Sequence, residues 1–111
     1  EHGISATHPE VAHGAGLAVV FPAWILYMKD YNKQTFHRWA RKVFGARNAE
    51  YAVEKMRAKF SKWRARISLR ELSITEEEIK DIAENAMGMG KLGVVKKLSK
   101  KDVEAILRLA L

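Results

Sequence analysis

No charged side chain occurs between Leu17 and Met28, and this run is the most apolar part of the chain. A helix that crosses a bilayer needs about 20 apolar residues, so this run is too short to span a membrane. It also lacks the basic region that should precede the apolar core of a signal peptide. The run therefore predicts a buried helix over 14–28. Pro22 lies inside it and removes one backbone hydrogen bond, so we expect a kink or a local break there.

Four further segments place apolar residues three and four positions apart, which is the spacing of one buried helical face. Residues at their ends support this reading: Gly45 is a typical C-terminal stop and Asn48 a typical N-cap. Thr75 and Ser99 can each begin a capping box. The predicted helices span residues 14–28, 33–44, 48–66, 75–87 and 99–110. In addition, residues 1–6 are typical of the end of a helix, and the chain as a whole is predicted to be all-α.

The length of 111 residues suits one domain with a modest core, so we expect a single helical bundle over residues 1–111. Only residues 93–95 admit a short strand. The chain contains no cysteine, which excludes disulfides, thiolate metal sites and a cysteine nucleophile, and fits a cytoplasmic protein. The net charge is +7 and the pI is near 9.8. Such a balance suits binding to nucleic acid or an acidic partner, or one lobe of a larger protein.

A histidine and two glycines, His13-Gly14-Ala15-Gly16, introduce the apolar helix. A ring at this position can reach a ligand while the helix behind it stays fixed. However, a site needs several convergent groups, and a lone histidine before a helix is more often a cap or a core residue than a metal ligand. The local pattern therefore leaves both interpretations of His13 open.

Residues 88–93 contain three glycines, which could suggest a phosphate-binding loop. No Gly-Lys-Ser/Thr follows and no strand precedes, so an ordinary loop is predicted. The chain also begins at Glu1 without an initiator methionine, on what reads as the tail of a helix. We therefore expect a fragment or a processed product.

Taken in order, several blocks resemble the C-terminal part of the iron-containing (group III) alcohol dehydrogenases, in their butanol dehydrogenase branch. The likeness covers essentially the whole chain and is most specific in the first two blocks. The blocks are Glu1-His2-Gly3-Ile4-Ser5-Ala6, AHGAGLAVVFPAW over 12–24, Phe36-His37-Arg38-Trp39-Ala40, Val43-Phe44-Gly45, SLRELSI over 68–74 and LSKKDVEAIL over 98–107.

The resemblance implies an all-helical domain that holds a divalent metal, iron or zinc, beside an N-terminal α/β domain that binds NAD or NADP. In this family one Asp and three His bind the metal. His13 matches the last metal-ligand histidine, and His2 matches a histidine that lines the catalytic site without binding metal. The remaining Asp, two His and the pyrophosphate loop should lie upstream of Glu1. His8 and His37 match no ligand and are expected in a loop or at the surface.

One departure from the family concerns the interval from His2 to His13, which is one residue longer than expected for this branch. The extra residue falls within 7–10, in the loop. It affects the expected orientation of His2 more than that of His13.

Three hypotheses follow. The leading one is the C-terminal portion of a metal-dependent, NAD(P)-linked alcohol dehydrogenase that acts on small alcohols and aldehydes, inactive as this segment alone. Its partners would be the N-terminal nucleotide-binding domain and a second copy of the chain, with no specific nucleic acid and no membrane. The second is a basic helical module that binds nucleic acid or an acidic partner, supported by the Lys/Arg excess over 38–70 and 91–101. The third is a purely structural helical domain.

Overall fold

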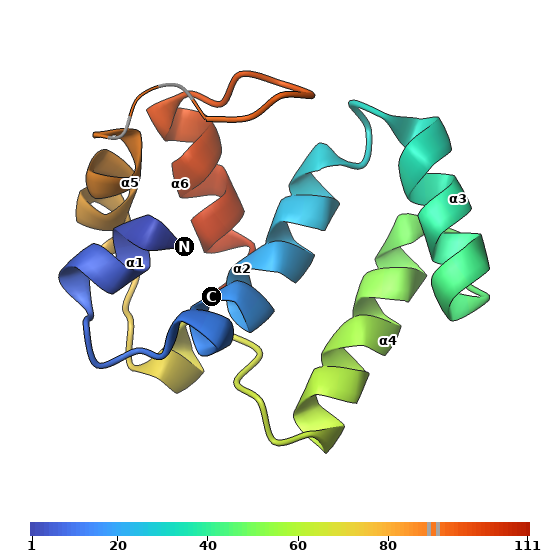
Figure 1. The fold of residues 1–111 in the computed structure, drawn as a ribbon, viewed down its shortest axis with the longest axis horizontal. Helices are drawn as coiled ribbons and strands as arrows, with labels where there is room; N and C mark the ends of the chain where they lie inside the picture. The colour runs from blue at the N-terminus through green and yellow to red at the C-terminus, as the bar shows by residue number, and fades with distance from the viewer. Residues whose placement is uncertain (89, 91) are drawn as a thin grey trace.

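A computed structural model of the chain describes residues 1–88, 90 and 92–111. Over these residues it contains α-helices, one short 3-10 helix and no strand, which confirms the all-α prediction (Figure 1). The short strand admitted at 93–95 is not formed. In its place the backbone N–H of Leu98 donates to the carbonyl of Leu92 at 2.9 Å, in an isolated bridge. The elements are α1 (His2–Thr7), α2 (His13–Met28), α3 (Lys33–Phe44), α4 (Ala49–Lys62), η1 (Arg70–Leu72), α5 (Ile79–Met87) and α6 (Lys100–Arg108).

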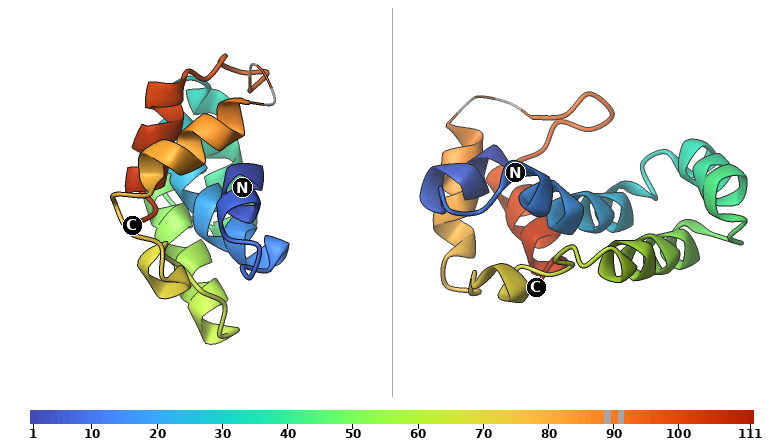
Figure 2. Two further views of the ribbon diagram at one scale, coloured as in Figure 1. Left: turned by 90° about the vertical axis from the view of Figure 1, so that its left-hand side faces the viewer. Right: turned by 60° about the horizontal axis from the view of Figure 1, so that its bottom comes forward.

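Helix α2 lies at the centre of the domain and contacts α1, α4 and α6. Figure 1 shows it between two groups of helices, with α3 and α4 on one side and α1, α5 and α6 on the other. A helix without charged side chains can bury more than one face, and this is why α2 can join both groups. The result is a thin molecule, 36 × 32 × 19 Å, in which α3 and α4 extend as a pair (Figure 2).

The main core brings together apolar side chains from all the α-helices of the described residues. Most of these side chains lie on the helical faces that the sequence pattern predicts. Its buried members include Ile4 of α1, Val19 and Ile25 of α2, Val53 of α4, Ile79 and Ile82 of α5, and Ile106 and Leu107 of α6. Two residues of the predicted stripes, Val43 and Trp63, are instead 64% exposed.

The predicted bounds of α2 and α3 are confirmed to within one residue, whereas the predicted end of α4 is wrong. Helix α4 ends at Lys62 and not at residue 66, because Arg64 adopts a left-handed backbone with φ of 62°. Neither glycine nor asparagine marks this turn in the sequence. The N-cap of α4 is as predicted, since the side chain of Asn48 accepts from the backbone N–H of Tyr51 at 3.0 Å. Gly45 likewise ends α3 with φ of 58°.

Helix α5 begins at Ile79 and not at residue 75. The carboxylate of Glu78 accepts from the backbone N–H and from the hydroxyl of Thr75, at 2.8 and 3.0 Å. Half of the predicted capping box is therefore present, but the threonine hydroxyl is used as a donor and not as a cap, and residues 76–78 form a bend and a turn before the helix. The second box is complete: Ser99 and Asp102 bond to each other's backbone N–H groups at the start of α6.

Pro22 lies inside α2, which is continuous from His13 to Met28, so the local break considered there does not occur. No helix in the described part of the chain is long and apolar enough to cross a bilayer. Of the predicted loop at 88–93, residues 89 and 91 lie outside the described residues. Gly90 and Gly93 have φ of 95° and 91°, which are backbone angles that glycine readily adopts in turns.

Candidate metal centre

The start of α1 and the start of α2 lie together, because the chain reverses direction through residues 8–12 between them. Helices α1 and α2 are in contact, and α1 is also packed closely on α5. This arrangement brings Glu1 and His2 to His13, the first residue of α2. One ligand atom from each of these three residues lies within 4.8 Å of the others. The structure thus places both predicted site histidines in one cluster and adds a carboxylate to them.

Glu1 is the most enclosed member of the cluster: its side chain is 5% exposed, whereas that of His13 is 56% exposed. Oε2 of Glu1 forms an ion-pair contact with Nδ1 of His13. The other oxygen, Oε1, accepts a hydrogen bond from the hydroxyl of Ser5 at 2.8 Å. Oε2 itself is buried and has no hydrogen bond of good geometry among the described residues. A buried carboxylate oxygen of this kind is costly unless a cation or a donor satisfies it.

The ring of His2 stacks on that of His13, with centroids 5.6 Å apart and an angle of 16° between the planes. Both rings are exposed. Imidazole nitrogens and a carboxylate are the donor types that bind iron and zinc. The imidazole nitrogens of this cluster, with a carboxylate beside them, are therefore of the chemical type that fits a divalent metal at this position, and these residues alone are fewer than a tight site requires.

An exposed apolar stripe continues from His13 along α2. Leu17 and Phe21 follow His13 at intervals of four residues, which puts the three side chains on one helical face. Leu17 is 45% exposed and Phe21 is 46% exposed. The ring of Phe21 stacks on Trp24, with centroids 5.8 Å apart. The cluster of polar donors thus adjoins an apolar surface that the described residues leave uncovered.

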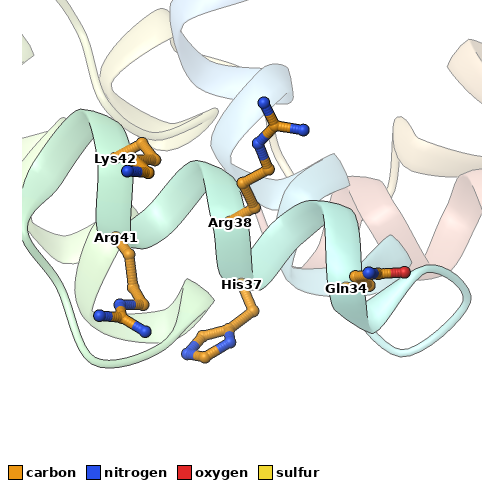
Figure 3. A pocket seen from close by; sticks show the side chains of 5 residues that line it. All are labelled: Gln34, His37, Arg38, Arg41 and Lys42. Atoms are coloured by element: carbon orange, nitrogen blue, oxygen red, sulfur yellow. The ribbon is translucent and has the colours of Figure 1, made fainter.

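The other two histidines lie away from the cluster. His8 follows α1 in the loop, as predicted, but its side chain is only 15% exposed and bridges Glu10 at 3.1 Å and Glu78 at 3.0 Å. His37 is exposed on α3, where it lines a shallow pocket that one basic helix face forms by itself (Figure 3). The other lining residues are Gln34, Arg38, Arg41 and Lys42. A depression made by one exposed helix lacks the convergent, enclosed groups of a binding site.

A polar cluster that the sequence analysis did not identify ties α2 to α6. Asp102 accepts hydrogen bonds from the hydroxyl of Tyr27 and the backbone of Ser99, and pairs with Lys96 at 2.7 Å. Lys96 and these hydrogen bonds hold the pKa of Asp102 well below its usual range. The neighbouring carboxylate in turn raises the pKa of Tyr27 to about 12. This cluster connects two helices and does not belong to the candidate metal centre.

Comparison with known proteins agrees with the family resemblance drawn from the sequence. All residues, 1–111, match the family described as "Fe-containing alcohol dehydrogenase family, C-terminal". The chain belongs to this family. The resemblance drawn from the sequence is thereby confirmed, and the helical fold is that of the family's C-terminal domain.

Individual relatives assign the chain to the butanol dehydrogenase branch. It is 33% and 35% identical to the probable NADH-dependent butanol dehydrogenases 1 and 2 of Bacillus subtilis, over 100% of its own length and 30% and 31% of theirs. The crystal structure of NADH-dependent butanol dehydrogenase A from Thermotoga maritima is similar with a TM-score of 0.89 at 36% identity, over 98% of this chain and 31% of that one. The chain thus spans about a third of the length of the dehydrogenases that it matches.

The sequence predicts His2 and His13 as site residues, and it does not single out Glu1, which the structure places in the same cluster. A loop separates Glu1 from His13 along the chain, so no regular helical spacing in the sequence predicts their contact. Two signals were nevertheless present: a carboxylate directly beside His2, and a glycine at position 16 where a larger residue would fill the space of that carboxylate.

Proposed function

We propose that this chain forms the metal-binding side of a metal-dependent dehydrogenase that interconverts small alcohols and aldehydes with NAD or NADP. Membership of the Fe-containing alcohol dehydrogenase family supports the class of reaction. The observation that carries the proposal is the convergence of Glu1, His2 and His13, with ligand atoms within 4.8 Å of one another. When bound, a divalent iron or zinc ion supplies a Lewis acid that stabilises negative charge on the oxygen of the substrate.

Each histidine of the cluster has a proposed role. His13, exposed and at the start of a helix with a buried face, offers one imidazole nitrogen to the metal. His2, stacked on it, lines the site and holds the substrate in place without binding metal. The Asp, the two further His and the nucleotide-binding loop would come from a part of the enzyme outside this chain. Without them the segment should be inactive and should hold no metal tightly.

The apolar face of α2 is the proposed contact with that part of the enzyme. Leu17 and Phe21 are about half exposed and lie on the same side of α2 as His13. An apolar surface next to a metal centre suits a nucleotide-binding domain that closes over it and excludes water from the reaction. The small alcohol would be held between the two parts, with its alkyl chain against this face.

The alternative, a basic module that binds nucleic acid, has weaker support. The net charge of +7 favours general attraction to polyanions. The basic residues in Figure 3, however, lie on one exposed helix, and acidic residues are interleaved along the other basic segments.

The test uses the complete protein that contains this chain. His13→Ala should lose metal and reduce turnover by orders of magnitude, because it removes a ligand of the ion that stabilises the transition state. His2→Ala should slow turnover while metal content stays nearly unchanged. His37→Ala, at an exposed histidine of α3, is the control and should change neither quantity. Full metal content and normal turnover in His13→Ala would refute the assignment.

A further inference from the structure

We propose that Glu1 is a positioning residue: its carboxylate accepts a hydrogen bond from Nδ1–H of His13 and so leaves Nε2 as the atom that binds the metal. The proposal rests on the proposed function, since it takes His13 to be a ligand. It adds a residue to the site whose action passes through His13 and not through direct contact with metal or substrate.

Glu1 and His13 are chemically complementary, because a buried carboxylate oxygen of Glu1 faces a ring nitrogen of His13 that can carry a proton. Oε2 of Glu1 is buried, and among the described residues its polar contact is with Nδ1 of His13. The imidazole is more than half exposed and has a neutral form in which either nitrogen can carry the proton. A carboxylate only accepts hydrogen bonds, so the nitrogen that faces it must carry the proton. The lone pair that a metal requires then lies on Nε2.

Glu1 is held in place by its surroundings. The hydroxyl of Ser5 donates to Oε1 at 2.8 Å and ties the carboxylate to the next turn of α1. Gly16 also lies against this side chain: a Cβ atom there would be 2.7 Å from Oε1 and 3.0 Å from Cγ of Glu1. The side chain is only 5% exposed. An enclosed acceptor held by such contacts can fix the orientation of an exposed imidazole.

The contact between Glu1 and His13 also matches the usual chemistry of metal-binding histidines. A histidine that binds a metal usually donates its other N–H to a carboxylate or a carbonyl, which selects the tautomer and orients the ring. Glu1 is the carboxylate that the structure places on Nδ1 of His13. His2 contacts the same ring by stacking. Together they would restrain the imidazole along an edge and across a face.

The experiment measures metal dissociation constants by competition with a chelator, for zinc, in the complete protein. Glu1→Ala should weaken zinc binding by about 10- to 100-fold, the usual effect of removing such a partner. Glu1→Gln should lose less, because its amide oxygen still accepts from Nδ1–H. Glu10→Ala is the matched control: Glu10 also contacts a histidine Nδ1, that of His8 at 3.1 Å, but outside the cluster, and its loss should leave zinc binding unchanged.

A second readout reports the tautomer directly. In metal-free protein labelled with 15N-histidine, the NMR signals of His13, identified by their absence in His13→Ala, should show the proton on Nδ1. Glu1→Ala should shift this equilibrium toward the Nε2–H form. A proton on Nε2 in the wild-type protein would overturn the proposal.

Two other results are equally decisive. Equal losses of affinity in Glu1→Gln and Glu1→Ala would overturn the proposal, since they would indicate that the carboxylate binds the metal itself. Unchanged affinity in Glu1→Ala would also overturn it. Neither result bears on whether His13 is a ligand, because failure of that assignment appears separately, as full metal content in His13→Ala.

Discussion

Gly16 provides the space that the carboxylate of Glu1 occupies, because a Cβ atom at position 16 would lie 2.7 Å from Oε1. Gly16→Ala should therefore displace Glu1 and loosen His13. We expect zinc binding by the complete protein to weaken by roughly 10-fold, within the range for changes beside a metal ligand. The dissociation constant measured against a chelator checks this.

A nearby glycine offers the control. Gly14 lies in the same helical turn but has no atom within 4 Å of the position of a Cβ, so Gly14→Ala should leave zinc binding unchanged. The double variant Glu1→Ala/Gly16→Ala should bind zinc no more weakly than Glu1→Ala alone, since the methyl group then meets no carboxylate. Additive losses in the double variant would contradict the proposed steric link.

The close packing of α1 on α5 leads to a second prediction. A Cβ atom at Gly3 would lie 2.4 Å from the carbonyl oxygen of Ile82 and 3.0 Å from Cβ of Ala86. A backbone oxygen cannot move away as a side chain can, so Gly3→Ala should force the two helices apart. We expect a loss of roughly 1–3 kcal/mol in the free energy of unfolding, the usual effect of overpacking. Chemical denaturation of the chain measures it, and an unchanged midpoint would show that α1 accommodates the methyl group.

The sequence predicted helices best where local signals and packing agree. Helix α3 has an N-cap at Asn32, a buried stripe and an αL glycine at Gly45, and its predicted bounds are those observed. Helix α4 ends before its predicted end because Arg64 has a positive φ, and an arginine in the sequence does not predict such a backbone conformation. Val43 and Trp63 stand at the predicted apolar spacing but are 64% exposed, so periodicity overestimates their burial.

The site shows the same limit in another form. The sequence predicts His2 and His13 as site residues because short motifs carry them, whereas Glu1 is defined by contacts with residues 5, 13 and 16. Such contacts depend on how α1 packs on α2 and α5. No pattern along the chain encodes that packing directly.

The polar cluster between α2 and α6 predicts a dependence of stability on pH. Asp102 has a lowered pKa, chiefly because of the hydrogen bond from Lys96. Its contribution to the free energy of unfolding is therefore complete above the ordinary aspartate pKa of about 3.9, and it is lost as the pH falls below that value. Asp102→Asn should reduce the free energy of unfolding by about 1–3 kcal/mol near pH 7. The difference from wild type, measured by denaturation, should shrink below about pH 4. A difference that stays constant down to pH 2 would contradict this account.

Tyr27 should make the stability of the fold depend on pH in the alkaline range. Its pKa is raised to about 12, mainly by the hydrogen bond to Asp102, so the folded chain binds the phenolic proton more tightly than the unfolded chain does. Stability from this source is complete below the ordinary tyrosine pKa of about 10 and declines as pH rises toward 12. Tyr27→Phe should lower stability near neutral pH and flatten this decline. The absorbance of tyrosinate at high pH, compared between the wild type and Tyr27→Phe, reports the titration.

The apolar face of α2 leads to a prediction about association. Leu17 and Phe21 are 45% and 46% exposed and adjoin His13, where the proposed nucleotide-binding domain would sit. Exposed apolar surface of this kind promotes association, so the 111-residue chain alone should self-associate or bind that domain added in trans. Replacing both residues with serine should weaken either association by at least 10-fold, as sedimentation or titration calorimetry would measure. Val43→Ser is the control, because Val43 is more exposed, at 64%, but lies on α3 away from the candidate metal centre. If Val43→Ser had the larger effect, the contact would lie on the face formed by α3 and α4, and the proposed position of the nucleotide-binding domain over α2 would be wrong.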